Sequence, residues 1–411
     1  MIKEYLKKWI MIFIIAVLDL LIAAKTSLPF FYFFFWLLIW VVAISFFWVF
    51  IEYFLAVFKV RRIVDSRVRE GDLLTLEAQI TNGGPLPIFN FILEDGLSCA
   101  PLNDKKRLLV IDYLPSGVSR TIRYSCRCPQ RGKYRIGPLV LYFFDPLGIF
   151  FLKRKYNIFS DIYVFPRIFK IRNFPVISKG SFPWFGIESG RVTGEDDEFY
   201  GIREYRESDP VKRIHWISTA RKNRLMVKQF QHQAFYKATI IFNLESGKNY
   251  GQGTERVAEY IIRIAASVSK YLLDNNVALE IFANTGELVH IPANKGPEYL
   301  EDILRFLTLA EAKSKVSLVE TFEEFYRHVP NDTTLVVIML DKDWEVISKI
   351  MSLEKRNVSL VPLILISSTF LYSFEKLELL KDIKIKLTKS FNFTPLLISR
   401  GDSLEEVFLK S

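Results

Sequence analysis

Two long runs of apolar residues near the start of the chain constrain its fold more than any other feature. The first covers residues 9–24 and the second residues 30–58, and a short segment containing Lys25 and Pro29 separates them. A helix that crosses a bilayer needs about 20 predominantly apolar residues. The second run is long enough, and the first reaches this length when apolar neighbours are included. We therefore predict a transmembrane helical hairpin over residues 1–59. A cleavable signal peptide is the alternative for the first run, but no small-residue cleavage site follows it.

The basic residues around the hairpin predict its orientation. Lys25 is the basic residue between the two runs, whereas the outer ends carry Lys3, Lys7, Lys8, Lys59, Arg61, Arg62, Arg67 and Arg69. Cytoplasmic segments near membrane spans carry an excess of Lys and Arg. We therefore expect a multi-pass protein of the cell membrane with residues 60–411 in the cytoplasm. Asp19 and Glu52 fall within or beside the apolar runs, and either a functional role or an interfacial position explains them.

The three cysteines of the chain fit a reducing compartment. Three Cys in 411 residues exclude a disulfide-stapled secreted scaffold. Cys126 and Cys128 are two residues apart in a strand-like stretch, which separates them by about 6.6 Å along the chain. That is too far for an easy disulfide. Cys99 is distant in sequence, and the three together lack the four-ligand spacing of a structural zinc site. We expect free thiols.

Residues 60–170 read as an all-β, immunoglobulin-like sandwich. Strand patterns bounded by turn residues occur at residues 60–68, 72–82, 89–97, 120–129, 132–146 and 156–166. Six or seven short strands in roughly 110 residues are typical of such a sandwich. The segment has no carboxylate pair, phosphate-binding loop or His cluster, so we expect a spacer or binding module.

Residues 171–235 form a linker followed by the densest polar segment of the chain. Residues 171–193 are rich in Pro, Gly and Ser, and residues 194–231 interleave acidic, basic and aromatic side chains. Such interleaving fits a clamp between domains or a partner-binding patch, because Arg pairs with carboxylates in a planar, bidentate manner and Trp is a common interface anchor. The candidate residues for either role are Glu198, Arg203, Tyr205, Asp209, Arg213, Trp216 and Arg221.

This segment resembles the conserved stretch of the bacterial and archaeal domain of unknown function 58 family, often called MoxR-associated membrane proteins. The matching positions are Glu198, Phe199, Arg203, Tyr205, Asp209, Pro210, Arg213, Ile214, Trp216, Ala220, Arg221, Leu225 and Val227. Residues 131–150 also resemble the sandwich domain of the family, although Ser208 and Asn223 stand where we expect glycine. The resemblance implies a prokaryotic membrane protein of this architecture and a link to a MoxR-type AAA+ ATPase. It implies no activity.

Residues 236–411 predict an α/β domain with a parallel sheet. Near-continuous apolar strands at residues 238–244, 277–283, 334–340 and 358–366 alternate with amphipathic helices at residues 254–274, 298–310 and 343–353. This alternation is typical of a parallel sheet covered on both faces. Ligands of such sheets bind at the carboxyl ends of the strands.

Two loops follow strands at that edge. Gly247-Lys248 is no phosphate-binding loop, because the earlier Gly and the following Ser or Thr of that motif are missing. The domain resembles a von Willebrand factor type A domain, in which an Asp-x-Ser-x-Ser loop and a later Asp hold a hard cation. The corresponding positions are Asn243, Glu245, Gly247 and Asp341. Because one charge and one hydroxyl are lost, we expect no cofactor, or weak Mg²⁺ binding at most.

No nucleophile, base and orienting group can be assembled from the sequence, so we do not expect an enzyme. The leading hypothesis is a membrane-anchored adaptor or assembly protein that works through protein–protein contacts, with no small-molecule substrate identified. One alternative is a hydrolase or transferase that uses Asp209, His215 and Arg221. Another is nucleic-acid binding through the basic stretch at residues 212–228, which the acidic residues between Glu198 and Asp209 disfavour.

Overall fold

The computed structural model describes residues 2–26, 28–65, 67–172, 174, 191–206, 209, 211–233, 237–326, 328, 333–343, 345–346, 349, 358–371 and 396–409. Side chains of residues 2–6, 191–200 and 229–233 are outside this description. The chain divides into two compact units, Met1–Phe165 and Pro166–Ser411. Each is considered by itself. The predicted linker at residues 171–193 and the predicted helix at residues 343–353 lie largely outside the described residues.

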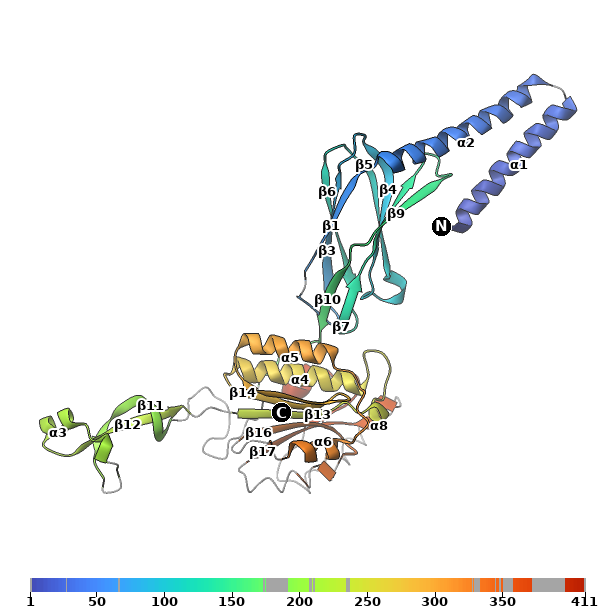
Figure 1. The fold of residues 1–411 in the computed structure, drawn as a ribbon. Coiled ribbons are helices and arrows are strands. Elements are labelled where there is room, and N and C mark those ends of the chain that lie inside the picture. The colour runs from blue at the N-terminus through green and yellow to red at the C-terminus, as the bar shows by residue number, and fades with distance from the viewer. Residues whose placement is uncertain are drawn as a thin grey trace. The chain divides into compact units, whose positions relative to one another are not determined.

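The first unit begins with two antiparallel helices, α1 (Ile2–Thr26) and α2 (Pro29–Leu55) (Figure 1). By length and composition, both are able to cross a membrane, and only 6% and 11% of their apolar windows are buried within the protein. Asp19 is half-buried in α1. The second helix is shorter than the apolar run that predicts it, because Ala56 is extended and Phe58 begins a strand with its side chain buried.

The last turn of α2 is attached to the strands that follow. A carboxylate oxygen of Glu52 accepts a hydrogen bond of 2.9 Å from the Phe89 backbone N–H. The guanidinium of Arg154 donates to the carbonyl oxygen of Ala56 at 2.5 Å and lies 4.4 Å from the ring centroid of Tyr53. Glu52 is 8% exposed, so its carboxylate faces protein rather than lipid.

The rest of the first unit is β-rich. Its strands are β1 (Phe58–Val64), β2 (Arg67–Arg69), β3 (Leu73–Asn82), β4 (Ile88–Gly96), β5 (Lys106–Leu114), β6 (Ser119–Arg127), β7 (Gly132–Ile136), β8 (Leu139–Phe144), β9 (Phe151–Tyr156) and β10 (Ser160–Phe165). They form sheets in the orders β1-β3-β6, β2-β10-β7 and β5-β4-β8-β9. Side chains alternate between core and solvent, most regularly along β3, and residues of all three sheets share one apolar core. The sequence patterns locate most of these strands but miss β5 and β9.

A buried ion pair lies inside this core. The Arg62 guanidinium pairs with the Asp95 carboxylate, and both side chains are fully buried. Tyr124 donates its hydroxyl hydrogen to the same carboxylate, and Arg62 also donates to the Ile136 carbonyl oxygen at 3.1 Å. Burial raises the pKa of Asp95 above its usual range, although the bonds from Tyr124 and Arg62 oppose the shift. Three strands, β1, β4 and β6, therefore meet at one polar cluster.

The second unit contains a six-stranded sheet with the order β15-β14-β13-β16-β17-β18. The strands are β13 (Lys237–Asn243), β14 (Ala278–Asn284), β15 (Leu288–Asn294), β16 (Thr334–Leu340), β17 (Ser359–Leu365) and β18 (Leu396–Ile398). The helices around it are α4 (Val257–Asp274), α5 (Pro297–Leu309), α6 (Leu318–Phe325), α8 (Ser367–Leu371) and α10 (Leu404–Leu409). Figure 1 shows α4 and α5 on one face of the sheet and α6 on the other.

The sheet is mixed rather than purely parallel. Strands β13, β14, β16 and β17 run parallel as predicted, and β18, which the sequence prediction missed, adds to them in the same direction. Strand β15 pairs antiparallel with β14. The sequence prediction missed β15 because this edge strand alternates exposed and half-buried residues and lacks an apolar run. Gly286, at φ +117°, allows the tight connection from β14.

A two-stranded element, residues 191–233, precedes this sheet in the sequence. Strands β11 (Arg191–Glu204) and β12 (Met226–Gln233) pair antiparallel, with register shifts in the first half of β11. Between them lie the short helices η2 (Val211–Arg213) and α3 (Trp216–Lys222). The polar segment predicted from the sequence therefore occupies this hairpin and the residues that connect its two strands, 205–225. We call this connection the excursion.

Candidate functional site

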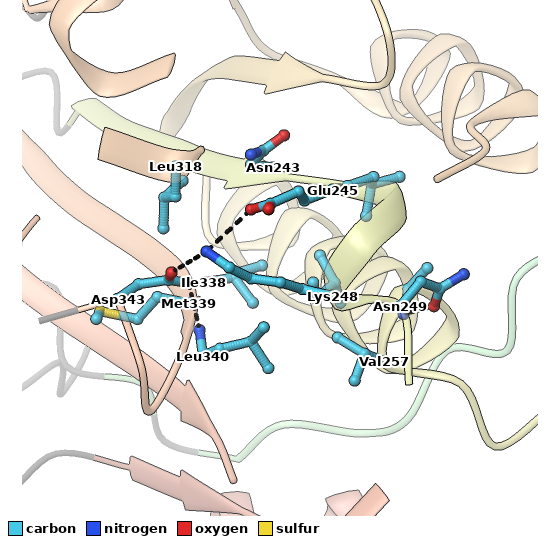
Figure 2. Close-up of a pocket in the computed structure, with 13 residues that line it drawn as sticks. Asn243, Glu245, Lys248, Asn249, Val257, Leu318, Ile338, Met339, Leu340 and Asp343 are labelled. Atoms are coloured by element: carbon cyan, nitrogen blue, oxygen red, sulfur yellow. Dashed lines mark hydrogen bonds and ion pairs between the residues drawn. The ribbon is translucent and has the colours of Figure 1, made fainter. Parts of the chain in front are cut away.

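The first candidate region is a pocket at the carboxyl ends of β13 and β16, which are neighbours in the sheet. Its polar lining comes from the loop after β13 and from Asp343, which follows β16. Val257, Ala258 and Ile261 of α4 and Leu318 of α6 supply apolar lining. Figure 2 shows the side chains of Glu245, Lys248 and Asp343 directed toward one point. The pocket thus lies at the edge where α/β sheets bind ligands.

An internal ammonium group occupies that point. The Nζ atom of Lys248 lies 2.9 Å from a carboxylate oxygen of Glu245 and 2.8 Å from one of Asp343 (Figure 2). The Asp343 side chain is 8% exposed, and its second oxygen accepts a bond of 3.2 Å from the Leu340 N–H. Burial lowers the pKa of Lys248, but the bonds to Asp343 and Glu245 outweigh it, and the pKa lies above its usual value. Lys248 therefore remains charged and neutralises the two acids.

The four residues of the predicted metal loop do not all meet here. Asn243 and Glu245 line the pocket, whereas Asp341 accepts a bond of 3.1 Å from the backbone of Ser367 and is not among the lining residues. Asp343, two residues later, takes the place expected for Asp341. Gly247 lies in the turn η3 (Ser246–Lys248), where an added Cβ would meet only Glu245 Oε1, at 3.9 Å. Gly247 therefore lacks the hydroxyl that a Ser would supply at this position, although a Ser side chain would have space.

Asn243 has an acceptor without a partner. Its amide nitrogen donates to the Val316 carbonyl oxygen at 2.8 Å, but its side-chain oxygen is buried without a hydrogen bond. A buried, unsatisfied carbonyl costs about 1–3 kcal/mol. Two other side chains of the pocket, Glu245 and Asp343, accept bonds from the internal cation.

The second candidate region is the excursion between β11 and β12. Arg203 and Asp209 form a bidentate pair, with Nη1 donating to Oδ2 at 2.6 Å and Nη2 to Oδ1. The Arg206 N–H donates to the same carboxylate at 2.8 Å. These bonds, led by that from Arg203, lower the pKa of Asp209. The pair joins two residues six apart in the chain, and it does not test the predicted clamp between domains.

His215 begins α3. Its Nδ1 accepts a bond of 3.3 Å from the Ser218 N–H and lies 2.8 Å from the Ser218 hydroxyl oxygen. This is the geometry of a helix N-cap, in which a side chain satisfies a free N–H of the first turn. At the other end Asn223 has φ +50°, a left-handed conformation that favours Gly or Asn. Asn223 therefore adopts a backbone conformation that glycine, expected at this position, would also adopt. Ser208 lies outside the described residues.

Large apolar side chains are exposed on this excursion. Val211, Trp216 and Ile217 are 65%, 66% and 64% exposed, and Leu225 is 45% exposed. The cations Lys212, Arg221 and Lys222 are also exposed and lie within the same 15 residues, 211–225. We call these seven residues the docking patch. Exposed aromatic and aliphatic side chains in a charged surrounding are typical of protein–protein contact sites.

The other predicted residues of the excursion have supporting positions. The Tyr205 N–H donates to the Leu225 carbonyl oxygen at 2.8 Å, which pairs the strand ends. Arg213 is half-buried in η2, and Arg221 is exposed in the last turn of α3. Glu198 lies in β11 opposite Gln231, and its side chain is outside the described part of the chain.

Comparison with known sequences supports the resemblance. Residues 201–363, which include the excursion and the pocket, match the family "Protein of unknown function DUF58". Over these residues the chain is similar to the family. No curated protein matches the sequence.

Three solved structures that resemble this chain each cover about a quarter of it. The CARDB domain of the PF1109 protein from Pyrococcus furiosus is 14% identical, with a TM-score of 0.20 over 27% of this chain and 87% of that one. The DNA glycosylase AlkC from Pseudomonas fluorescens is 12% identical, with a TM-score of 0.18 over 26% and 30%. The ApaA protein from Bordetella pertussis is 10% identical, with a TM-score of 0.19 over 26% and 94%. Similarities this weak carry no argument about function.

Sequence reasoning missed Lys248 and Asp343 as members of the pocket. The sequence pattern around Lys248 indicates only an incomplete phosphate-binding motif and gives no role to its ammonium group. A signal was present, because a Lys three residues after Glu245 in a tight turn lies within reach of its carboxylate. The end of β16 was predicted correctly, but it does not decide between Asp341 and Asp343, because Asp341 accepts a bond from the Ser367 backbone and Asp343 pairs with Lys248.

Proposed function

We propose that this protein is a membrane-anchored adaptor that binds a cytoplasmic protein partner through the docking patch. The observation that carries the proposal is the exposure of Trp216 and Ile217 side by side on α3, at 66% and 64%. Trp is the residue most enriched among energetic hot spots of interfaces. The Arg203–Asp209 pair and the His215 cap hold the excursion that presents them.

The partner that fits the patch has an apolar pocket with acidic residues around it. Lys212, Arg221 and Lys222 surround the apolar side chains with positive charge, which favours an acidic rim through electrostatic complementarity. The name used for the family makes a MoxR-type AAA+ ATPase the first partner to test.

We also propose a fold for each of the two units. We assign the β-rich part to an immunoglobulin-like sandwich, supported by antiparallel sheets that share one core. We assign the sheet of the second unit to a von Willebrand factor type A-like domain, supported by the pocket after β13 with Asn243, Glu245 and Gly247. In this assignment the Lys248 ammonium substitutes for the cation.

The proposed orientation places both ends of the helical hairpin at the cytoplasmic side. The native cysteines are buried and report poorly on orientation, whereas Leu102 is 82% exposed. An impermeant thiol reagent should therefore leave a Leu102→Cys variant unmodified in intact cells and modify it in opened cells. Modification in intact cells would contradict the cytoplasmic position.

Docking is tested by site-specific photocrosslinking in living cells. A photoreactive amino acid at position 217 should give an adduct with the AAA+ ATPase, and the adduct should disappear in a Trp216→Ala background. The matched control carries the same group at position 102, another exposed apolar site, and should give no such adduct. Identical adducts at positions 217 and 102, or none containing the ATPase at 217, would contradict the proposed partner.

Catalysis is not part of the proposal. His215 Nδ1 is engaged at the start of α3, and the Asp209 carboxylate is occupied by Arg203 and Arg206. Two of the three groups of the hydrolase alternative, Asp209 and His215, therefore have local structural partners.

A further inference from the structure

All three cysteine side chains of the protein meet in the core of the β-rich part. Cys99, Cys126 and Cys128 are the chain's only cysteines, and all are buried, free thiols. Their sulfur atoms all lie within 4.8 Å of one another, and those of Cys99 and Cys126 are 3.7 Å apart. The sequence prediction of free thiols agrees with this arrangement. Cys99, although distant in sequence, lies beside the other two.

The strand arrangement explains why they meet. Cys126 lies in β6 and Cys128 follows its last residue, so the alternation of side chains directs both sulfurs to the same face. Cys99 lies in the turn after β4, which belongs to a different sheet. The Cys128 backbone is fixed by two hydrogen bonds, from its N–H to Asp72 O and from the Gly71 N–H to its carbonyl oxygen. The cluster therefore connects two sheets across their shared core.

The spacing of the sulfurs fits a metal ion better than a disulfide. A metal bound to three thiolates in a plane, with bonds of about 2.3 Å, places the sulfurs about 4.0 Å apart. The Cys99–Cys126 sulfur distance is 3.7 Å and no sulfur pair is more than 4.8 Å apart, so the required distance lies between these two values. A disulfide needs a sulfur separation of about 2.05 Å, so even Cys99 and Cys126 would have to approach by more than about 1.5 Å.

The donor set selects the ion. Thiolates favour soft ions such as Cu⁺ and Zn²⁺, and hard ions such as Mg²⁺ and Ca²⁺ require oxygen ligands. Zn²⁺ in structural sites takes four protein ligands. The metal-binding group found among the described residues has three. The buried carboxylate of Asp95 in this core already accepts bonds from Arg62 and Tyr124.

We infer that Cys99, Cys126 and Cys128 form a three-coordinate site for Cu⁺ that joins the two sheets of the β-rich part. Each thiol that becomes a ligand releases its proton to solvent, so no oxidant or reductant is needed. The three cysteines belong to the first unit, whereas the pocket and the docking patch belong to the second. The inference does not depend on the proposed function.

The test is a copper titration of the purified full-length chain in detergent under anaerobic conditions. Cu⁺ is supplied as its bicinchoninate complex, and the loss of the complex's colour measures transfer to the protein. The wild type should take up one Cu⁺ per chain. Cys126→Ser and Cys128→Ser should each weaken binding by more than about 100-fold, because even outer contacts of metal ligands are worth 10- to 100-fold.

A matched variant separates loss of a ligand from loss of the fold. Tyr124→Phe removes a buried hydrogen bond to Asp95 in the same core and changes no sulfur, so it should still bind one Cu⁺. X-ray absorption of the loaded wild type should show three sulfur neighbours of copper, a readout that does not require a variant to fold.

Four results would overturn the inference. The first is uptake by the wild type no greater than that of a variant with all three cysteines replaced by serine. The second is an absorption spectrum with fewer than three sulfur ligands. The third is Zn²⁺ that remains bound while excess Cu⁺ is supplied. The last is a Cys99–Cys126 disulfide in protein isolated anaerobically.

Discussion

Replacing Lys248 by Ala should turn the pocket of the second unit into a divalent-cation site. The ammonium lies between the carboxylates of Glu245 and Asp343, at 2.9 and 2.8 Å. Without the ammonium, two carboxylates face an unfilled position. Mg²⁺ binds through one or two carboxylates and keeps several waters, so these ligands are sufficient for weak binding.

The free-energy cost of the change follows from burial. Removing one partner of a fully buried ion pair costs about 3–5 kcal/mol, whereas an exposed pair is worth about 0–1 kcal/mol. Lys248 and Glu245 are 26% and 22% exposed and Asp343 is 8% exposed, which lies between these cases. We expect a loss of about 2 kcal/mol in the free energy of local opening, or about 30-fold faster amide exchange.

Hydrogen exchange of the full-length chain measures this loss in peptides from β13 and β16, the two strands that end at the pocket. Adding Mg²⁺ at ten times its dissociation constant should return about 1.4 kcal/mol to the variant, which slows exchange about tenfold. The wild type should not respond, because its ammonium already occupies the position.

Lys313→Ala is the matched control. It also removes one Lys–Glu pair, but Lys313 and Glu311 are 69% and 63% exposed. Exchange in β13 and β16 should stay within about twofold of the wild type. The reasoning is refuted if Lys248→Ala exchanges like the wild type, or if Mg²⁺ slows exchange equally in both.

Three further predictions concern stability. Arg62→Met leaves the buried Asp95 carboxylate without its cation, and urea unfolding of the β-rich part should show a loss of about 3–5 kcal/mol. Burial raises the pKa of Tyr260 to about 12, so the folded chain keeps a phenol proton that the unfolded chain loses from about pH 10. Stability should therefore fall as the pH rises from 10 to 12, and less steeply in Tyr260→Phe by up to one proton in the slope. Arg154→Ala removes the bonds to the end of α2, and amides of residues 53–58 should exchange faster while those of β6 do not change.

The sequence predicted the parts of the fold that follow from local periodicity. Residues 334–340 form β16 as predicted, and the predicted strand at residues 277–283 is shifted by one residue in β14. Continuous apolar runs locate buried strands because both of their faces are covered. Strands β5 and β15 were missed because their burial is irregular or weak, and only pairing with a neighbour makes them strands.

The pairs at the candidate sites were harder to predict, because they join residues from different elements. The Arg203–Asp209 pair lies within one short loop, and the sequence predicted both as members of a clamp or patch. Lys248 and Asp343 are 95 residues apart, and Cys99 and Cys126 are 27 residues apart. These contacts are set by which strands become neighbours and where they end, which periodicity does not specify.

The docking patch combines exposed apolar side chains with exposed cations, and its energetics decide what kind of partner it fits. Burying a large apolar side chain is worth about 1.5–3 kcal/mol, so Trp216 and Ile217 together provide about 3–6 kcal/mol. Association itself costs about 4–15 kcal/mol, so these two anchors alone do not produce a stable complex. The cations Lys212, Arg221 and Lys222 must then contribute, and their contribution is screened by salt. Partner binding should therefore weaken as salt rises, mainly through slower association, whereas Trp216→Ala should mainly accelerate dissociation. Equal effects of salt and Trp216→Ala on the dissociation rate, measured with the purified partner, would contradict this division between charge and apolar contact.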